Sequence, residues 1–268
     1  MTDSDAALAA AVRADLVAMM ALLHEPPFGE VHAGPEAIWF LTGRSEPAAN
    51  GVLHAELDVH DPGASIQRLL EPFRSHGVPM TWWRFTPPEP SNGTLDAALR
   101  RHGLALESDR PGFGLELRDL RPVRPPAGAR VERVWDPDAF ASWAWVVGLA
   151  FGDPAFADGP SVRAFQALGF GDDAPFIHVV CRIGDEAVGA ATLSRAAGVA
   201  GLGNIAVVPG RRGEGLGATV ASAALVEART LGLEVAGLSS DPLGVALYRK
   251  LGFREVSRHL TYVWHPER

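Results

Sequence analysis

The stretch VVPGRRGEGLGATV, residues 207–220, joins a run typical of a strand to a run typical of a helix. The six residues from Gly210 to Gly215 are all glycine or charged. A glycine-rich turn that opens a helix presents several backbone N–H groups on one side, and the helix dipole adds partial positive charge there. Glycines let a phosphate approach the backbone, and arginines can add charge-assisted hydrogen bonds. Taken alone, the stretch fits a phosphate-ester site and an ordinary surface turn equally well.

The residues around this loop alternate between strand-like and helix-like patterns. Apolar residues at three- and four-residue spacing predict helices over 136–151, 161–170, 216–232 and 242–252. Asp-Pro opens the first and the last of these helices, and Gly169, Gly232 and Gly252 end the other three segments in turn. Runs of alternating or continuous apolar residues predict strands over 129–134, 176–195 (as a hairpin), 202–208, 233–239 and 255–264. The predicted fold class is α/β, with a mixed sheet.

The first part of the chain repeats the end of this pattern. Helices are predicted over 64–77 and 95–104, and strands over 78–85 and 112–117. AALRRHGL (97–104) aligns with ALYRKLGF (246–253), so that Gly103 meets Gly252, and Gly77 likewise matches Gly232. We interpret the chain as two diverged copies of one fold. The proline-rich stretch DLRPVRPPAGAR separates them. The predicted domains are therefore 1–120 and 130–268, with a linker over 121–129.

Two segments of the second domain resemble signatures of the GNAT acetyltransferase superfamily. V-x-P followed by RRGEGLGA resembles its acyl-CoA motif, with Arg212, Gly215 and Gly217 in the key positions. LYRKLGF (247–253) resembles its second signature, and the resemblance covers about residues 130–268. Rival motifs are missing: there is no Gly-Lys-Ser/Thr, and no ribose-binding acidic residue follows a second strand. The resemblance implies the acyl-CoA N-acyltransferase fold in two tandem copies.

The resemblance also implies acetyl-CoA as the acyl-donor cosubstrate. Its pantetheine arm is expected between the strand 204–208 and the strand 233–239, bonded to backbone like an added strand. One backbone N–H there would hold the oxyanion. The pyrophosphate is expected on the glycine loop. The residues implied for acetyl-CoA are Ala206, Val207, Val208, Arg211, Arg212, Gly213, Glu214, Gly215, Leu216, Gly217, Ala218 and Ser240.

Tyr248 is the implied catalytic residue, as the proton donor to the departing thiolate. A phenol with a pKa of about 10 stays protonated at neutral pH. The family's usual glutamate base is missing from AGVAGLGNIAVV. A backbone carbonyl with water, Asp241 or His178 could replace it, or no base is needed. Glu214 also departs from the family pattern by placing negative charge in the phosphate loop, where we expect it to point to solvent.

The first copy lacks this cofactor apparatus. The equivalent loop falls near LDVHDPGAS (57–65), where Asp58 and Asp61 repel an anion and Pro62 lacks an N–H donor. Leu99 stands where Tyr248 stands in the second copy. We therefore expect one acyl-CoA site per chain. We also expect residues 126–268 on their own to bind acetyl-CoA but to lose solubility or acceptor turnover.

The composition narrows the function classes further. A net charge of −8 and a pI near 5.6 disfavour nucleic acid and favour cationic ligands. A single cysteine excludes an intramolecular disulfide. The sequence contains no His-x-x-x-His spacing, so we predict no metal site. The acidic, alanine-rich start and the lack of an apolar run near 20 residues predict a cytoplasmic protein without a membrane partner.

The predicted function is acetyl-CoA-dependent N-acetylation of an amine, on a small molecule or a peptide, by direct attack in a ternary complex. Two alternatives stay open: a non-catalytic acyl-CoA-binding or sensing module, and transfer of an acyl or aminoacyl group to another acceptor, such as a hydroxyl. The sequence also leaves open a homodimer.

Overall fold

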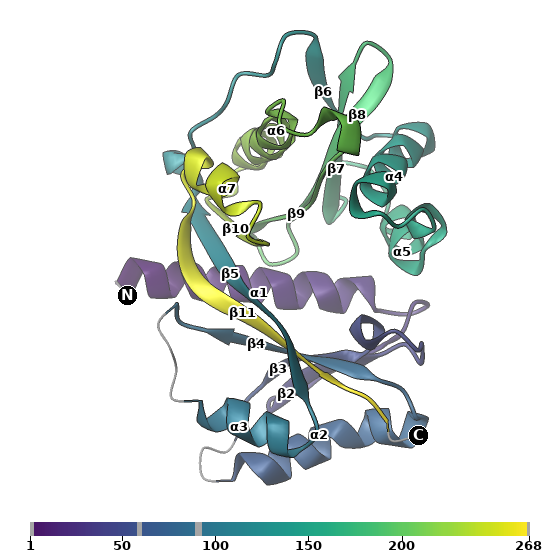
Figure 1. Ribbon diagram of the computed structural model, residues 1–268, viewed down its shortest axis with the longest axis vertical. Coiled ribbons are helices and arrows are strands. Elements are labelled where there is room, and N and C mark those ends of the chain that lie inside the picture. Colours follow the sequence, from purple (N-terminus) through teal and green to yellow (C-terminus); the bar gives the residue numbers. More distant parts are fainter. Residues whose placement is uncertain (1–2, 58–60, 89–92, 267–268) are drawn as a thin grey trace. The chain divides into compact units, whose positions relative to one another are not determined.

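The computed structural model describes residues 3–57, 61–88 and 93–266, and the chain divides into two compact units (Figure 1). Of the described residues, unit 1 comprises 20–57, 61–88, 93–111 and 256–266, and unit 2 comprises 3–19 and 112–255. These bounds differ from the predicted domains, 1–120 and 130–268. Most of the first helix groups with unit 2 and most of the last strand groups with unit 1, so neither unit is continuous in sequence.

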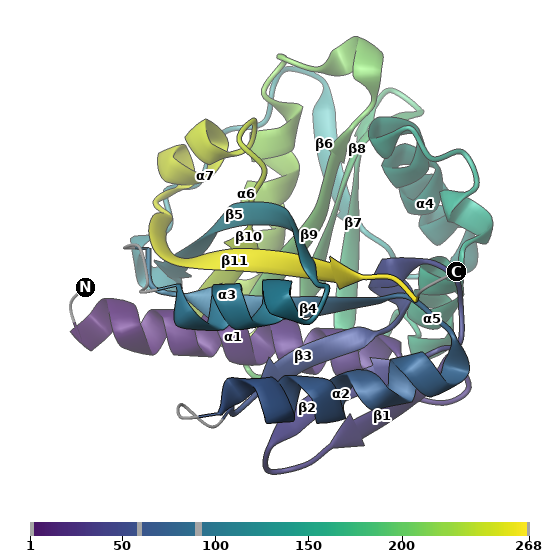
Figure 2. The same ribbon diagram turned by 60° about the horizontal axis from the view of Figure 1, so that its bottom comes forward.

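Unit 1 is a mixed sheet with two helices. Its elements are β1 (Glu30–Ala33), β2 (Ala37–Leu41), η1 (Pro47–Ala49), β3 (Gly51–Ala55), α2 (Pro62–His76), β4 (Met80–Thr86), α3 (Thr94–Arg101), the start of β5 (Ala105–Glu116) and most of β11 (Arg254–Trp264). The strand order is β1-β2-β3-β4-β11-β5. Helices α2 and α3 lie side by side (Figure 2). The amphipathic face of α2 explains its position, because Ile66, Leu70 and Phe73 are fully buried in the core.

Unit 2 is a mixed sheet covered by helices on both faces (Figure 1). Its elements are α1 (Asp3–Leu23, to residue 19), the end of β5, η2 (Leu117–Asp119), β6 (Ala129–Arg133), α4 (Pro137–Phe151), η3 (Phe156–Asp158), α5 (Pro160–Leu168), β7 (Phe176–Ile183), β8 (Glu186–Ser194), β9 (Ala200–Val207), η4 (Pro209–Arg211), α6 (Leu216–Thr230), β10 (Val235–Ser239) and α7 (Val245–Leu251). The strand order is β5-β10-β9-β8-β7-β6. Helices α4 and α5 lie on one face of β7–β9, and α6 lies on the other.

The two units repeat one topology. In each unit, two antiparallel strand pairs lead into a helix, a strand parallel to the third strand, and a second helix: β1-β2-β3-α2-β4-α3 and β7-β8-β9-α6-β10-α7. Gly77 and Gly232, aligned from sequence, both follow their helix with positive φ, +63° and +80°. The internal repeat predicted from sequence is confirmed at the level of topology.

The strand that ends each copy in sequence, β5 or β11, pairs with the other copy. In unit 2, β10 of the second copy pairs along five residues with β5, which ends the first copy. In unit 1, β4 pairs along seven residues with β11, which ends the second copy. Each unit therefore takes a strand from the other half of the sequence. This exchange is the reason why a cut at the proline-rich linker does not separate the units.

Helix α1 corrects one expectation. Residues 3–23 form a 21-residue helix with a mean hydropathy of 1.9, long and apolar enough by length and composition to cross a membrane. The sequence pattern predicts no such run, because Arg13 and Asp15 interrupt the apolar residues. Its contacts are those of a helix packed on a sheet, because Leu8, Val12 and Asp15 are buried.

A row of glycines receives α1. Gly114 on β5, Gly237 on β10 and Gly201 on β9 are register partners across three neighbouring strands. A Cβ atom on each would meet Leu8, Val12 and Asp15 respectively, which are spaced four and three residues apart on one face of the helix. We call Gly114, Gly237 and Gly201 the glycine row. It lets α1 approach the backbone of unit 2 more closely than side chains would allow.

Candidate functional site

Two parallel strands of unit 2 separate toward their carboxyl ends. Strands β9 and β10 pair only at Ala200–Ala236 and Gly201–Gly237, although β9 continues to Val207 and β10 to Ser239. Beyond the two pairs, β9 stays paired with β8, and β10 stays paired with β5. Backbone groups on the facing edges of β9 and β10 are thereby left without a strand partner. We call this opening the β9–β10 gap.

The ladder geometry decides which backbone groups of β9 face the gap. The Val208 N–H donates to the Val188 carbonyl at 3.0 Å, and Ala206 and Val207 pair with Ala190 and Gly189 of β8. Hydrogen-bonded and non-hydrogen-bonded pairs alternate in an antiparallel ladder. Ala206 and Val208 therefore direct their backbone groups toward β8, and Val207 directs its own toward the gap. Of the three residues predicted together, the structure singles out Val207.

A bulge precedes Val207. Thr192 pairs with Gly203 and Ala190 pairs with Ala206, so two residues of β9, Asn204 and Ile205, lie opposite one residue of β8. Asn204 has φ of +49°, and it is the only described residue other than glycine with a positive φ in residues 3–57, 61–88 and 93–266. Asparagine tolerates this conformation better than most residues.

The glycine loop follows β9 and ends at an open helix terminus. Gly213 and Gly215 have φ of +85° and +80°, and a Cβ on either would meet no atom within 4 Å. Gly215 is the N-cap of α6 and has no side chain to accept a hydrogen bond from the first turn. The first N–H groups of a helix have no intrahelical partner. Those of Leu216, Gly217 and Ala218 are thus placed to bind an anion.

The two loop arginines have internal partners. The Arg211 Nε lies 3.1 Å from the Glu214 carboxylate, and Arg212 donates to the Ala150 carbonyl at the end of α4 at 2.6 Å. Glu214 is exposed to solvent, as expected, and its carboxylate also forms an ion pair with Arg211. Both side chains of that pair are partly exposed, so the pair costs little to break.

The equivalent helix of unit 1 is capped by its own side chain. The Asp61 carboxylate accepts a hydrogen bond from the Ala64 N–H at 3.2 Å at the start of α2. It supplies negative charge where the Gly215 cap of α6 supplies none. Asp58, the other acidic residue expected in this loop, lies outside the described residues. The contrast agrees with an anion site on α6 and none on α2.

Tyr248 lies on α7 near the carboxyl end of β10. Its side chain is buried, and its ring packs 6.2 Å from that of Phe113 and 5.9 Å from that of Phe253. Burial, and then the negative charge of Asp241, raise the pKa of the Tyr248 phenol above its usual value near 10. The phenol therefore stays protonated at neutral and mildly alkaline pH, as a proton donor requires.

Ser240 and Asp241 have local hydrogen bonds in the turn before α7. The buried Ser240 Oγ donates to the Asp241 carbonyl at 2.7 Å. The Asp241 carboxylate accepts from the Leu243 and Gly244 N–H groups at 2.9 and 3.0 Å. The helix expected from residue 242 begins at Val245, because Asp241 closes a turn before it. A Cβ on Gly244 would lie 2.7 Å from both Ser240 and Tyr248, so these two side chains are close neighbours.

His178 is poorly suited to the role of general base. It is 1% exposed, and burial lowers the pKa of its imidazole to about 3. Its Nδ1 lies 2.9 Å from the Thr192 Oγ1, and the Asn204 Nδ2 donates to the same hydroxyl at 3.4 Å. Its Nε2 is buried without a hydrogen-bond partner. Sequence reasoning missed Thr192 and Asn204, although Gly-Asn inside a strand pattern is a signal for a bulge.

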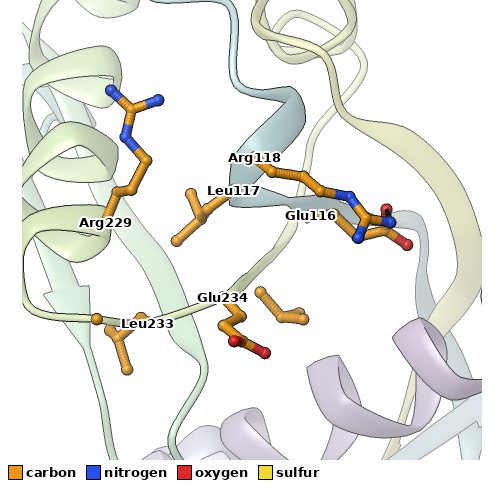
Figure 3. A pocket seen from close by; sticks show the side chains of 8 residues that line it. Glu116, Leu117, Arg118, Arg229, Leu233 and Glu234 are labelled. Carbon is orange, nitrogen blue, oxygen red and sulfur yellow. Dashed lines mark hydrogen bonds and ion pairs between the residues drawn. The ribbon is translucent and has the colours of Figure 1, made fainter.

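A cavity of about 510 Å³ lies at the opposite end of β10 (Figure 3). It is lined by Glu116, Leu117, Arg118, Arg229, Gly232, Leu233, Glu234 and Val235. Arg118 lies along Glu116 and forms a 2.7 Å ion pair with it. The cavity is removed from the glycine loop and the β9–β10 gap, so we assign it no part in the site.

Comparisons with known proteins agree with this geometry. Residues 140–253 match the model of the acetyltransferase (GNAT) family. No curated protein matches the chain in sequence. The fold is similar to that of a GCN5-related N-acetyltransferase from Kribbella flavida, with a TM-score of 0.75 and 19% identity over 96% of each chain.

Two further structures extend the comparison. A tandem GNAT protein from the clavulanic acid biosynthesis pathway is similar with a TM-score of 0.68 and 14% identity, over 94% of this chain and 88% of that one. A GCN5-related N-acetyltransferase from Sphaerobacter thermophilus has a TM-score of 0.62 and 18% identity, over 87% and 82%. Residues 140–253 thus form a domain of the acetyltransferase (GNAT) family, within a chain that has the fold of GCN5-related N-acetyltransferases throughout.

Proposed function

We propose that the protein transfers an acetyl group from acetyl-CoA to an amine of a small molecule or a peptide. The observation that carries the proposal is the β9–β10 gap, which ends at the uncapped amino terminus of α6. A gap with free backbone groups suits an extended amide chain. A helix terminus capped only by glycine suits a pyrophosphate. The two features adjoin in the order in which they occur along coenzyme A.

The residues fit this donor in two places. The N–H groups of Leu216, Gly217 and Ala218, with Gly213 and Gly215 leaving space, would hold the pyrophosphate. Arg211 and Arg212 would add positive charge once Arg211 breaks its ion pair with Glu214 and Arg212 breaks its hydrogen bond to the Ala150 carbonyl. The backbone of Val207 would bond the pantetheine arm and place an N–H donor near the thioester carbonyl.

The chemistry that we propose needs one proton donor from the protein. The uncharged amine nitrogen attacks the thioester carbonyl carbon, and the carbon–sulfur bond then breaks. The Tyr248 phenol gives its proton to the departing thiolate and regains one from solvent, and the amine loses its proton to a water molecule that a backbone carbonyl can orient. We also propose that the protein is cytoplasmic. Its single cysteine, Cys181, is buried and forms no disulfide, as is usual for proteins of that reducing compartment.

Only the second copy is proposed to hold acetyl-CoA. Asp61 occupies the helix terminus of α2 with its own carboxylate, and the buried Leu99 replaces the tyrosine. A pyrophosphate there would meet negative charge rather than free N–H donors. We therefore propose one acetyl-CoA per chain.

A second function, acyl-CoA binding without catalysis, is favoured by two observations on the general base. Strand β9 carries no glutamate, and His178, the histidine considered as a base, is neutral and buried. A binding module needs no base, whereas an enzyme would have to take its amine already uncharged. Turnover decides between the two functions.

The test is release of free thiol from acetyl-CoA with a panel of amines and hydroxyl compounds. We expect thiol release with at least one amine, and loss of release in Gly215→Asp, which places a carboxylate at the anion site. Gly184→Asp is the matched control, because Gly184 also has positive φ and open space but lies in the β7–β8 turn. Acetyl-CoA binding without release for any acceptor would support the binding module. Release with hydroxyl compounds alone would overturn the amine assignment.

A further inference from the structure

The bulge in β9 lies just past the point where the β9–β10 gap begins. Strand β9 last pairs with β10 at Gly201, and the bulge follows at Asn204 and Ile205. A bulge bends its strand and changes the direction of the residues that follow. The direction of the Val207 backbone therefore depends on the conformation of Asn204, which is held at a φ of +49°.

Three side chains on neighbouring strands connect to this bulge. The Asn204 Nδ2 on β9 donates to the Thr192 Oγ1 on β8 at 3.4 Å, and that oxygen lies 2.9 Å from the His178 Nδ1 on β7. Thr192 and His178 are also directly opposite each other in the β7–β8 register. Both are buried, at 4% and 1% exposed. Low local polarity strengthens such bonds and makes their loss costly.

Burying the His178 imidazole at this position costs free energy of folding. The rings of Phe140, Trp143, Phe165 and Phe176 surround it, at centroid distances from 4.4 to 6.5 Å. Its Nε2 is buried without a partner, a cost that phenylalanine would avoid. The hydrogen bond between the His178 Nδ1 and Thr192 is the one polar contact that the ring makes with the described residues. That contact leads to the bulge.

We propose that His178, Thr192 and Asn204 are positioning residues for the acyl-donor site. Their hydrogen bonds fix the bulge of β9 and so hold the backbone of Val207 toward the gap. None of the three touches the reacting atoms in this account. The proposal rests on the proposed function for the identity of the donor, and on the bulge geometry for everything else.

The first test compares binding of acetyl-CoA and ADP by titration calorimetry. Thr192→Val keeps the side-chain shape and removes both hydrogen bonds. We expect it to weaken acetyl-CoA binding roughly three- to tenfold, as the loss of one or two net hydrogen bonds would. ADP binding should not change, because ADP reaches the glycine loop and lacks the pantetheine arm. Thr192→Ser, which keeps the hydroxyl, should restore most of the acetyl-CoA affinity.

The second test needs no ligand. Amide hydrogen exchange should become faster at residues 204–208 in Thr192→Val and in His178→Phe, and it should stay unchanged in α6. Unchanged exchange there, or equal weakening of acetyl-CoA and ADP, would overturn the positioning role. If the wild-type protein binds no acetyl-CoA, the proposed function fails, and the exchange experiment still decides whether these residues fix the bulge.

Discussion

At the scale of single residues, Tyr248 has the properties of a proton donor without those of a base. Burial and Asp241 keep its pKa above the usual value. Tyr248→Phe keeps the ring packed against Phe113 and Phe253 and removes the proton. We expect kcat to fall roughly 10²-fold or more, in line with general-acid effects, while the Kd for acetyl-CoA changes little. Steady-state kinetics beside calorimetry measures both. An unchanged kcat would make Tyr248 a packing residue and leave water as the donor.

Asp15 is a buried carboxyl without a cationic partner in the described part of the chain. Asp15 is 3% exposed, and the Ser194 hydroxyl donates to its two carboxylate oxygens at 3.0 and 2.9 Å. Burial raises the pKa of this carboxyl to about 6, and the bonds from Ser194 and from the Ala197 backbone reduce the increase. The folded state therefore binds this proton more tightly than the unfolded state does. The resulting stability is present below about pH 4 and is lost as the pH rises through 6.

Asp15→Asn should remove this pH dependence. We expect the variant's free energy of unfolding, relative to wild type, to rise by up to about 3 kcal/mol between pH 4 and pH 7, since one pKa unit is worth about 1.4 kcal/mol. Urea denaturation of both proteins at the two pH values measures the difference. His178 and His259, whose pKa values burial lowers to about 3 and about 4, act in the opposite direction but equally in both proteins. Parallel pH profiles would show that Asp15 is solvated or paired.

At the scale of elements, the glycine row explains how α1 packs on unit 2. A Cβ on Gly237 would lie 2.5 Å from a methyl carbon of Val12. Gly237→Ala should therefore cost about 1–3 kcal/mol of stability through overpacking. Gly203→Ala on β9 is the control, because a Cβ there meets no atom within 4 Å. Val12→Ala should relieve part of the cost, which a double-mutant cycle in urea would measure. Additive effects would mean that α1 does not rest on this glycine.

Elements with explicit end signals could be predicted from sequence, and those without could not. Helix α4 begins after Asp136, whose carboxylate accepts from the Ala139 N–H at 2.8 Å, and α2 ends at Gly77; both were expected. Helix α1 shows only an alanine-rich pattern, and the glycines that receive it lie on three strands far away in the sequence. Short β1, β2 and β3 lack strong alternation. Gly203 and Asn204 give a local signal for the bulge, but the hydrogen bond from Asn204 to Thr192, twelve residues away, has no signal in the local pattern.

At the scale of the whole molecule, the exchanged strands change what a fragment can do. Residues 126–268 were expected to bind acetyl-CoA alone, but this fragment lacks α1 and β5, which belong to unit 2. Without β5, β10 loses a partner along five residues, and without α1, Gly237 and Gly201 are uncovered. We now expect the fragment to lack a cooperative thermal transition. Adding a separately produced chain of residues 1–120 should restore one. A fragment that melts cooperatively alone would show that α1 and β5 are dispensable.

The central claim is one acetyl-CoA site, on α6 and the β9–β10 gap. Titration calorimetry of the full chain with acetyl-CoA tests it most directly. The account predicts a stoichiometry near one, and no measurable binding in Gly215→Asp while Gly184→Asp binds normally. Bound ligand at a hundredfold excess over Kd should also stabilise the fold by about 2.7 kcal/mol. A stoichiometry near two would contradict the loss of the site in unit 1. No heat and no stabilisation at millimolar acetyl-CoA would contradict the function itself.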